Sequence, residues 1–331
     1  MNNSLQLVTV GDSTLDVFIA PSETETLCTI DQKECLVCFN YGDKIPVNSL
    51  GFSVGGNAAN NAVGAKRLGL QAALISSLGD DITGKQIAEA LQTESVNMSY
   101  VHTVIGGTSN YSSVITYGGE RTIFSYHAPK PYVVPDELPQ TDWMYLTSLG
   151  EGWEAVFAKV FAYLEKHPTT KLAFNPGSKQ LRAPLDSLTE VLSKTHLLYV
   201  NREEAEHLAQ LQDTVGKEKD LLFAMSKKGP RIVVITDGSN GAFVFNGQSY
   251  FFAPVFPQTA VERTGAGDAF GSGCLSALIK GKTLEEALLW GAINSASVIS
   301  KVGAQAGLLH EDEMHVFLDR ACEQGIMVTE L

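Results

Sequence analysis

The sequence of 331 residues lacks the features that mark secreted, membrane-spanning and nucleic-acid-binding proteins. It has only 5 cysteines, and such a sparse, odd-numbered set does not predict a disulfide framework. Apolar runs fall short of the about 18 residues that a membrane span needs, and the first residues lack a signal-peptide pattern. The 24 lysines and arginines are outnumbered by 37 acids, and the net charge of −13 disfavours nucleic acid as a ligand. We therefore expect a cytoplasmic protein without nucleic-acid or membrane partners.

The residues that are present are those of an ordinary globular α/β protein. Hydrophobic residues make up 44% and charged residues 18%, which is enough apolar material for a sizeable core. From Trp143 onward, strand-like and helix-like segments alternate, which predicts a parallel sheet covered by helices on both faces. The expected strands are 5–11, 72–77, 143–147, 171–174, 197–200 and 231–236. The expected helices are 57–68, 83–91, 153–166, 202–211, 216–227, 267–279 and 284–300.

Two segments, about 14–50 and 109–126, depart from this alternation. Both hold short apolar pieces between polar stretches and show no helical period. The second predicts a hairpin, because two strand-like runs flank Gly118-Gly119. The two segments could therefore pair into a small separate sheet. No internal repeat or linker divides the chain, so we expect a single domain over 1–331 with a β appendage.

The strongest functional signal is Thr264-Gly265-Ala266-Gly267-Asp268, a turn of small residues that opens an apolar helix. The glycines let a ligand approach the backbone, and the unpaired N–H groups of a first helical turn attract anions. Asp268 has two interpretations in this place. It stabilises the helix dipole, or it is a general base against a substrate hydroxyl next to a phosphoryl group.

A glycine-containing segment at 79–86 fits the first part of a P-loop without completing it. Gln86 stands where a serine or threonine would hold magnesium, and two acids would lie inside the phosphate cradle. We therefore expect an ordinary helix start, capped by Asp80, Asp81 or Thr83.

A second glycine turn, Gly55-Gly56, opens a helix of small residues. In the simplest interpretation, Asn57 caps this helix. However, Asn57, Asn60 and Asn61 lie close together in the sequence, and amides both donate and accept hydrogen bonds. The cluster therefore also suits a polyhydroxylated ligand.

Asn201 and Glu204 follow the end of an expected strand and begin the next helix. As helix starters, Asn201 would be the N-cap and Glu204 would suit the first turn. An amide and a carboxylate at this edge of the sheet could instead hold a hydrated magnesium ion, which contacts proteins through water. Residues 236–241 predict a turn between two strands.

In this order, the segments resemble the ribokinase-like (PfkB) carbohydrate kinase family. The resemblance spans roughly residues 5–320. The matching segments are residues 55–60 continuing to 68–69, residues 174–177, Asn201 with Glu204, residues 236–241 and residues 264–270. The resemblance implies a three-layer α/β/α sandwich with a mostly parallel central sheet and a small β-sheet lid formed by about 14–50 and 109–126.

The resemblance also implies an ATP-dependent kinase that transfers the γ-phosphoryl group to a hydroxyl of a small sugar, as fructokinases and ribokinases do. A nucleoside kinase of the adenosine type, with Phe18, Tyr111 or Phe124 lining a base pocket, remains open. A sugar-phosphate kinase and a catalytically silent sugar-binding homologue are further alternatives. Two copies of the chain could pair through the lid.

The resemblance assigns roles by position. Asp268 would be the catalytic base. The anion hole for the γ-phosphoryl group would use the N–H groups of Gly265, Ala266 and Gly267. Asn201 and Glu204 would organise ATP and Mg²⁺, with Glu204 holding the ion through water. The nucleotide side would include Thr236, Gly238, Gly241 and Asn294. The acceptor side would include Asp16, Gly55, Gly56, Asn57 and Asn60.

Two departures from the family pattern matter. Glu262-Arg263-Thr264 stands where the family commonly has Asp-Thr-Thr, and the common aspartate helps to form a monovalent-cation site. Potassium activation is therefore an open question: Arg263 could replace the cation, by pairing with Glu262 or facing the phosphates, or point to solvent while Glu262 serves the ion. Asn57 stands where ribokinases carry a lysine, so ribose is not assigned as the acceptor.

Overall fold

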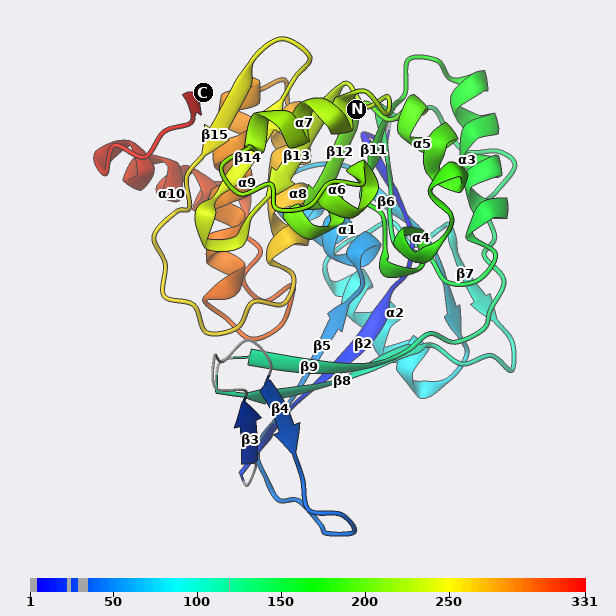
Figure 1. Cartoon of the computed structure of the whole chain (residues 1–331). Helices are drawn as coiled ribbons and strands as arrows, with labels where there is room; N and C mark the ends of the chain where they lie inside the picture. Colours follow the sequence, from blue (N-terminus) through cyan, green and yellow to red (C-terminus); the bar gives the residue numbers. More distant parts are fainter. Residues whose placement is uncertain (1–4, 23–24, 29–34, 119) are drawn as a thin grey trace.

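A ten-stranded sheet runs through the centre of the computed structural model, which describes residues 5–22, 25–28, 35–118 and 120–331 (Figure 1). From β13 to β7 neighbouring strands are parallel, and β14, β15 and β16 extend the sheet in antiparallel fashion. In spatial order the strands are β16 (Thr329–Glu330), β15 (Tyr250–Ala253), β14 (Ala242–Phe245), β13 (Ile232–Thr236), β12 (Leu197–Asn201), β11 (Lys171–Phe174), β10 (Trp143–Leu146), β1 (Leu7–Val10), β6 (Ala72–Gly79) and β7 (Val101–Val104).

Helices cover both faces of this sheet, because its central strands are apolar on both sides. Along β1, Leu7 packs in one core cluster, whereas Val8 and Val10 pack in another on the opposite face. The first face carries α1 (Asn57–Arg67), α2 (Ile82–Thr93), α8 (Ala266–Ile279), α9 (Leu284–Ile299) and α10 (Glu311–Glu323). The opposite face carries α3 (Trp153–Lys166), α4 (Ser178–Arg182), α5 (Thr189–Lys194), α6 (Arg202–Ala209) and α7 (Glu218–Ser226). The predicted three-layer sandwich is thereby confirmed.

A second, four-stranded sheet projects from the layered body (Figure 1). Its order is β5 (Val47–Gly55), β2 (Thr14–Pro21), β8 (Asn110–Tyr117) and β9 (Glu120–Tyr126). The two strand-rich segments thus pair as predicted, and β8 and β9 form the expected hairpin. A small hairpin, β3 (Glu25–Cys28) with β4 (Cys35–Cys38), lies between β2 and β5 in the sequence and extends beyond this sheet in Figure 1. We call the four-stranded sheet the lid.

Several elements were not expected from the sequence. Helix α10 buries only Met314 and Ala321, so its apolar pattern is too sparse to show a clear helical period. The edge strand β7 has only four residues, none of them fully buried.

The helix start predicted at 79–86 is confirmed. Asp81 caps α2 by accepting a hydrogen bond from Gly84 N at 2.7 Å, so this segment is a helix start and not a P-loop. None of the helices in the described part of the chain has the length and apolarity that a membrane span requires.

Candidate active site

The carboxylate of Asp268 lies at the N-terminal end of α8 and is held by an amide of α1. Asn60 Nδ2 donates to Asp268 Oδ2 at 2.8 Å, and Gln305 Nε2 donates to Asn60 Oδ1 at 3.0 Å. Asn60 and Gln305 are both buried, so this series of bonds fixes the direction of the carboxylate. Asn60, predicted to bind the acceptor, is therefore in direct contact with the predicted base.

The backbone before Asp268 forms a turn at Gly265, Ala266 and Gly267, which we call the cradle. Gly265 is the N-cap of α8 with φ +78°, and a Cβ atom there would lie 2.5 Å from the Cβ of Ala304. A Cβ on Gly267 would meet nothing within 4 Å, so this residue borders open space. Ala266 N donates to Arg263 O at 3.3 Å, whereas no described residue accepts from the N–H groups of Gly265 or Gly267. Of the three predicted anion-hole groups, two are therefore free, and Ala266 N is engaged.

Two nearby carboxylates, Glu204 and Asp16, affect the pKa of Asp268. The pKa of Asp268 is raised to about 6: burial raises it most, the Asn60 hydrogen bond opposes the rise, and the negative charges of Glu204 and Asp16 add to it. Burial also raises the pKa of Asp16 to about 6, against a hydrogen bond from Ser112. A carboxyl with a pKa near 6 is largely ionised at neutral pH and still basic enough to accept a proton.

We predict that Asn60→Ala moves the acidic limb of the kcat/KM profile to higher pH. As the predicted base, Asp268 would react as the carboxylate, so activity should fall as pH drops through its pKa. The Asn60 hydrogen bond favours that carboxylate, and its loss should raise the limb by about one pH unit. Rates measured from pH 5 to 8 test this, with Asn57→Ala as the control, because Asn57 donates instead to Asn175. An unmoved limb in Asn60→Ala contradicts the prediction.

The side chain of Asp16, on β2, lies next to Gly55 at the end of β5. In the lid register Asp16 pairs with Ser53, and Thr14 pairs with Gly55. A Cβ on Gly55 would collide with Asp16 Oδ2, so only glycine leaves room for this carboxylate. The predicted acceptor residues Asp16 and Gly55 are thus brought together.

The cap of α1 differs from the prediction. Gly56, with φ +93°, is the N-cap, and Asn57 is the first helical residue. A Cβ on Gly56 would lie 2.5 Å from Asp12 O, so this position requires glycine. The side chain of Asn57 is free of capping and donates to Asn175 Oδ1 at 3.1 Å. Asn175 lies in the 174–177 segment and donates its own amide N–H to Tyr199 O at 2.9 Å.

A pocket of about 410 Å³ lies between the turn at 236–241 and the start of α8. Most of its lining is apolar, and the lining includes Gly238 and Gly241 of the turn and Ala266 and Phe270 of α8. Both glycines have positive φ and leave the wall free of side chains. Thr236 ends β13, and the turn joins it to β14, as predicted. An apolar slot that ends at an anion-binding helix start suits a nucleotide.

Asn294 does not line this pocket, so its assignment to the nucleotide site is wrong. It is fully buried between α8 and α9. Its amide donates to Ala269 O at 2.9 Å and Ser272 Oγ at 3.1 Å, and its oxygen accepts from Leu309 N at 3.0 Å. Through these bonds Asn294 links α9 to α8 and to Leu309.

Asn201 and Glu204 form a reciprocal capping box. Asn201 Oδ1 accepts from Glu204 N at 2.8 Å, and Glu204 Oε2 accepts from Asn201 N at 2.9 Å. Burial nevertheless raises the pKa of Glu204, with Glu203 nearby, so a cation close to Glu204 would be favourable. The described residues hold no group of three or more His, Cys, Asp or Glu that could enclose a metal. A single, partly buried carboxylate fits Mg²⁺, which takes most of its ligands from water and phosphate.

Arg202 was not recognised as a site residue from the sequence. It is buried and lies 2.9 Å from both Asp237 and Glu218. Its hydrogen bond to Asp237 raises the pKa of the guanidinium, and the same ion pair helps to lower the pKa of Asp237. Arg202 therefore fixes the nucleotide-side turn to the start of α6. Arg202 lies between Asn201 and Glu204 in the sequence, and this position was the signal from which its role could have been predicted.

Arg263 does not pair with Glu262. Its exposed guanidinium lies 3.7 Å from Glu120 at the tip of the lid, and it borders the nucleotide pocket. Glu262 is buried, lies 3.7 Å from Arg121, and accepts hydrogen bonds from the N–H and hydroxyl of Thr264. The lid tip and the turn before α8 are thus joined by two ion pairs.

The fold and the site together define a kinase with the ribokinase fold. The structure is similar to that of Arabidopsis thaliana ribokinase complexed with ribose and ATP, with a TM-score of 0.78 and 21% identity. The match covers 95% of this chain and 99% of that chain. The fold expected from the sequence is thereby confirmed.

The model of the pfkB family carbohydrate kinases matches residues 24–311, so the chain belongs to this family. A Haemophilus influenzae ribokinase is 28% identical over 296 residues, which are 85% of this chain and 92% of the relative. A nucleoside kinase from Methanocaldococcus jannaschii is 26% identical over 261 residues, which are 77% of this chain and 82% of the relative. The protein is an ATP-dependent kinase of the PfkB type for a sugar or a nucleoside.

Proposed function

We propose that the protein transfers the γ-phosphoryl group of ATP to a hydroxyl of a small sugar. The observation that carries the proposal is the carboxylate of Asp268, with a pKa raised to about 6, beside the free N–H groups of Gly265 and Gly267. Asp268 accepts the proton of the attacking hydroxyl. The two N–H groups stabilise the negative charge of the phosphoryl group during transfer.

The nucleotide lies in the apolar pocket bordered by Gly238 and Gly241, with its phosphates toward Gly265. Asn201 and Glu204 organise the phosphate end, and Glu204 contacts Mg²⁺ through water. Bound Mg²⁺ neutralises charge on the phosphates. Arg202 keeps the nucleotide-side turn in place through Asp237.

The acceptor binds under the lid, against Asp16, Gly55, Gly56 and Asn57, while Asn60 positions the base. Two of the three aromatic residues considered for a base pocket lie on the face away from Asp16, which favours a sugar over a nucleoside as the acceptor. Phe18 shares the face of Asp16, because residues two apart in a strand point the same way. Tyr111 and Phe124 belong to the other face, since they pair in register with Leu15 and Ser113.

The test is ADP release across pentoses, hexoses, keto-sugar acids and nucleosides at fixed Mg-ATP. Turnover with one or more sugars, at a kcat/KM well above that with any nucleoside, is expected. Preference for nucleosides would contradict the proposal.

We propose that Glu262 serves a monovalent cation. It is buried, and its Oε2 lacks a hydrogen-bond partner among the described residues. Activity should rise severalfold in potassium relative to tetramethylammonium, because a cation at this turn helps to shape the anion hole. The response should persist in Arg263→Thr and vanish in Glu262→Ala. Equal rates in the two salts would refute the assignment.

We propose that two copies pair through the outer face of the lid. Four large side chains on this face are exposed by half or more: Leu50, Phe52, Phe124 and Tyr126. Contiguous apolar surface of this kind marks an interface. Phe52→Ser with Phe124→Ser should raise the dimer dissociation constant at least about tenfold, measured by sedimentation velocity. Val316→Ser, which removes an exposed apolar side chain on α10, is the control and should change nothing.

A further inference from the structure

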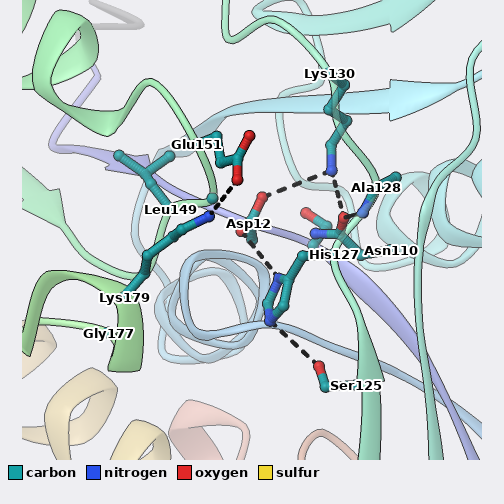
Figure 2. A network of polar contacts seen from close by, with 12 residues as sticks. Asp12, Asn110, Ser125, His127, Ala128, Lys130, Leu149, Glu151, Gly177 and Lys179 are labelled. Carbon is teal, nitrogen blue, oxygen red and sulfur yellow. Dashed lines mark hydrogen bonds and ion pairs between the residues drawn. The ribbon is translucent and has the colours of Figure 1, made fainter. Parts of the chain in front are cut away.

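A buried polar network lies where the lid meets the body, and the proposed mechanism does not use it (Figure 2). Asp12 follows β1, Asn110 begins β8, and His127 and Lys130 follow β9. Lys130 Nζ donates to Asn110 Oδ1 and lies 3.8 Å from Asp12 Oδ1. The side chain of Lys130 is fully buried, which is unusual for lysine, and Asp12 provides the opposite charge.

Two polar atoms of this network lack partners. Asp12 Oδ1 accepts from Tyr132 Oη at 2.7 Å, but Asp12 Oδ2 has no hydrogen bond within the described residues. Asn110 Oδ1 also accepts from Ala128 N at 3.0 Å, while Asn110 Nδ2 donates to no described residue. Asp12 and Asn110 are only 4% and 2% exposed, so water does not replace the missing hydrogen bonds. Burying the two unpaired atoms therefore costs folding free energy. A hydroxyl group could donate to the free oxygen of Asp12 and accept from the free N–H of Asn110.

The network adjoins the acceptor site. Asn110 pairs in register with Thr14, and Thr14 pairs with Gly55, so the three residues form one row across neighbouring lid strands. Asp16 lies two residues beyond Thr14 and therefore on the same face. A Cβ on Gly56 would touch Asp12 O, which places the backbone of Asp12 directly behind the glycine turn.

His127 closes the network on its outer side. Its Nδ1 lies 3.8 Å from Asp12 Oδ2, and its ring also contacts Ser125 Oγ at 3.3 Å (Figure 2). The imidazole is half exposed and lies against Asp12 Oδ2, which is itself buried.

We propose that Asp12 Oδ2 and Asn110 Nδ2 form a specificity subsite for a second hydroxyl of the acceptor, remote from the hydroxyl that is phosphorylated. The acceptor's O–H donates to Asp12, and its oxygen accepts from Asn110. Lys130 and Tyr132 hold the carboxylate in place. The acceptor class is then a polyhydroxylated sugar, and the subsite rejects a flat apolar base because such a group leaves both polar atoms unpaired. This inference rests on the proposed sugar-kinase function.

The test compares Asp12→Asn with the wild type, using D-fructose, D-glucose, D-ribose and their monodeoxy derivatives. The variant keeps an oxygen for Tyr132 and loses the charged acceptor. Its KM for the preferred sugar should rise at least about tenfold, with kcat and the KM for ATP changed less than about threefold. In the wild type, one monodeoxy sugar should show a similar rise, and Asp12→Asn should no longer distinguish that derivative from its parent.

Asp12→Asn with Lys130→Met gives a second variant without an unpaired buried charge, and the same loss of discrimination is expected if the single variant folds poorly. Glu151→Gln, at an exposed ion pair with Lys179 in Figure 2, is the matched control and should leave every KM unchanged. Sugar phosphorylation with an unaltered KM in Asp12→Asn would overturn the subsite alone. Turnover of nucleosides but of no sugar would overturn both the subsite and the proposed function.

Discussion

Replacement of Asp268 by asparagine is expected to lower kcat by about 10²–10⁴-fold while the chain stays folded. The amide has the same shape and can still accept the hydrogen bond that Asn60 donates at 2.8 Å. It cannot take a proton from the acceptor hydroxyl. The measurement is steady-state ADP release, with ATP affinity by calorimetry, which should change by less than about threefold.

Asp312→Asn separates catalysis from helix stabilisation. Asp312 lies in the first turn of α10, as Asp268 lies in the first turn of α8, but Asp312 is exposed, whereas Asp268 is hydrogen-bonded to Asn60. Both substitutions remove a favourable charge from a helix start, worth about 0.3–1 kcal/mol. Only Asp268→Asn should lose turnover. Near-normal kcat in Asp268→Asn would remove this residue as the base.

The second large effect is expected from Gly265→Ala. The residue has φ +78°, and the added Cβ would lie 2.5 Å from the Cβ of Ala304. The turn must shift, which moves the N–H groups of Gly265 and Gly267 away from the phosphoryl group. Loss of one such donor costs about 10²–10³-fold in kcat, and we expect a decrease of that size.

Gly281→Ala is the matched control for backbone strain. Gly281 has φ +76°, and its added Cβ would meet nothing within 4 Å. Both variants should lose about 1–2 kcal/mol of stability from the left-handed conformation, measured by urea unfolding. Only Gly265→Ala should also lose activity. If its kcat stays at the wild-type value, the cradle is not the anion hole.

The parts of the structure that could be predicted are those with strong local signals. Strand β11 and helix α3 have the predicted bounds, because each is a continuous apolar or amphipathic segment with clear ends. The start of α8 was visible because its glycines and acid stand together. The hydrogen bond between Asn60 and Asp268 joins residues 208 positions apart, and no local pattern encodes that pairing.

The errors at the site have the same origin. Asn294 was assigned to the nucleotide side by the family resemblance, but three bonds to Ala269, Ser272 and Leu309 satisfy it in the core. Arg202 was overlooked because its partners, Glu218 and Asp237, lie on other elements. Whether a polar side chain serves a ligand or the fold depends on neighbours that come from distant segments.

The lid is tied to the body by very short connections. Only Gly11, Asp12 and Ser13 separate β1 from β2, and Gly56 alone separates β5 from α1. These connections also border the proposed acceptor site, so any rotation of the lid would hinge next to the bound acceptor. A small angular change at Gly56 becomes a large displacement at the distant tip, Glu120, which meets Arg263. We therefore expect an acceptor bound at this hinge to restrict the rotation of the lid and, through Glu120 and Arg263, to affect the border of the nucleotide pocket.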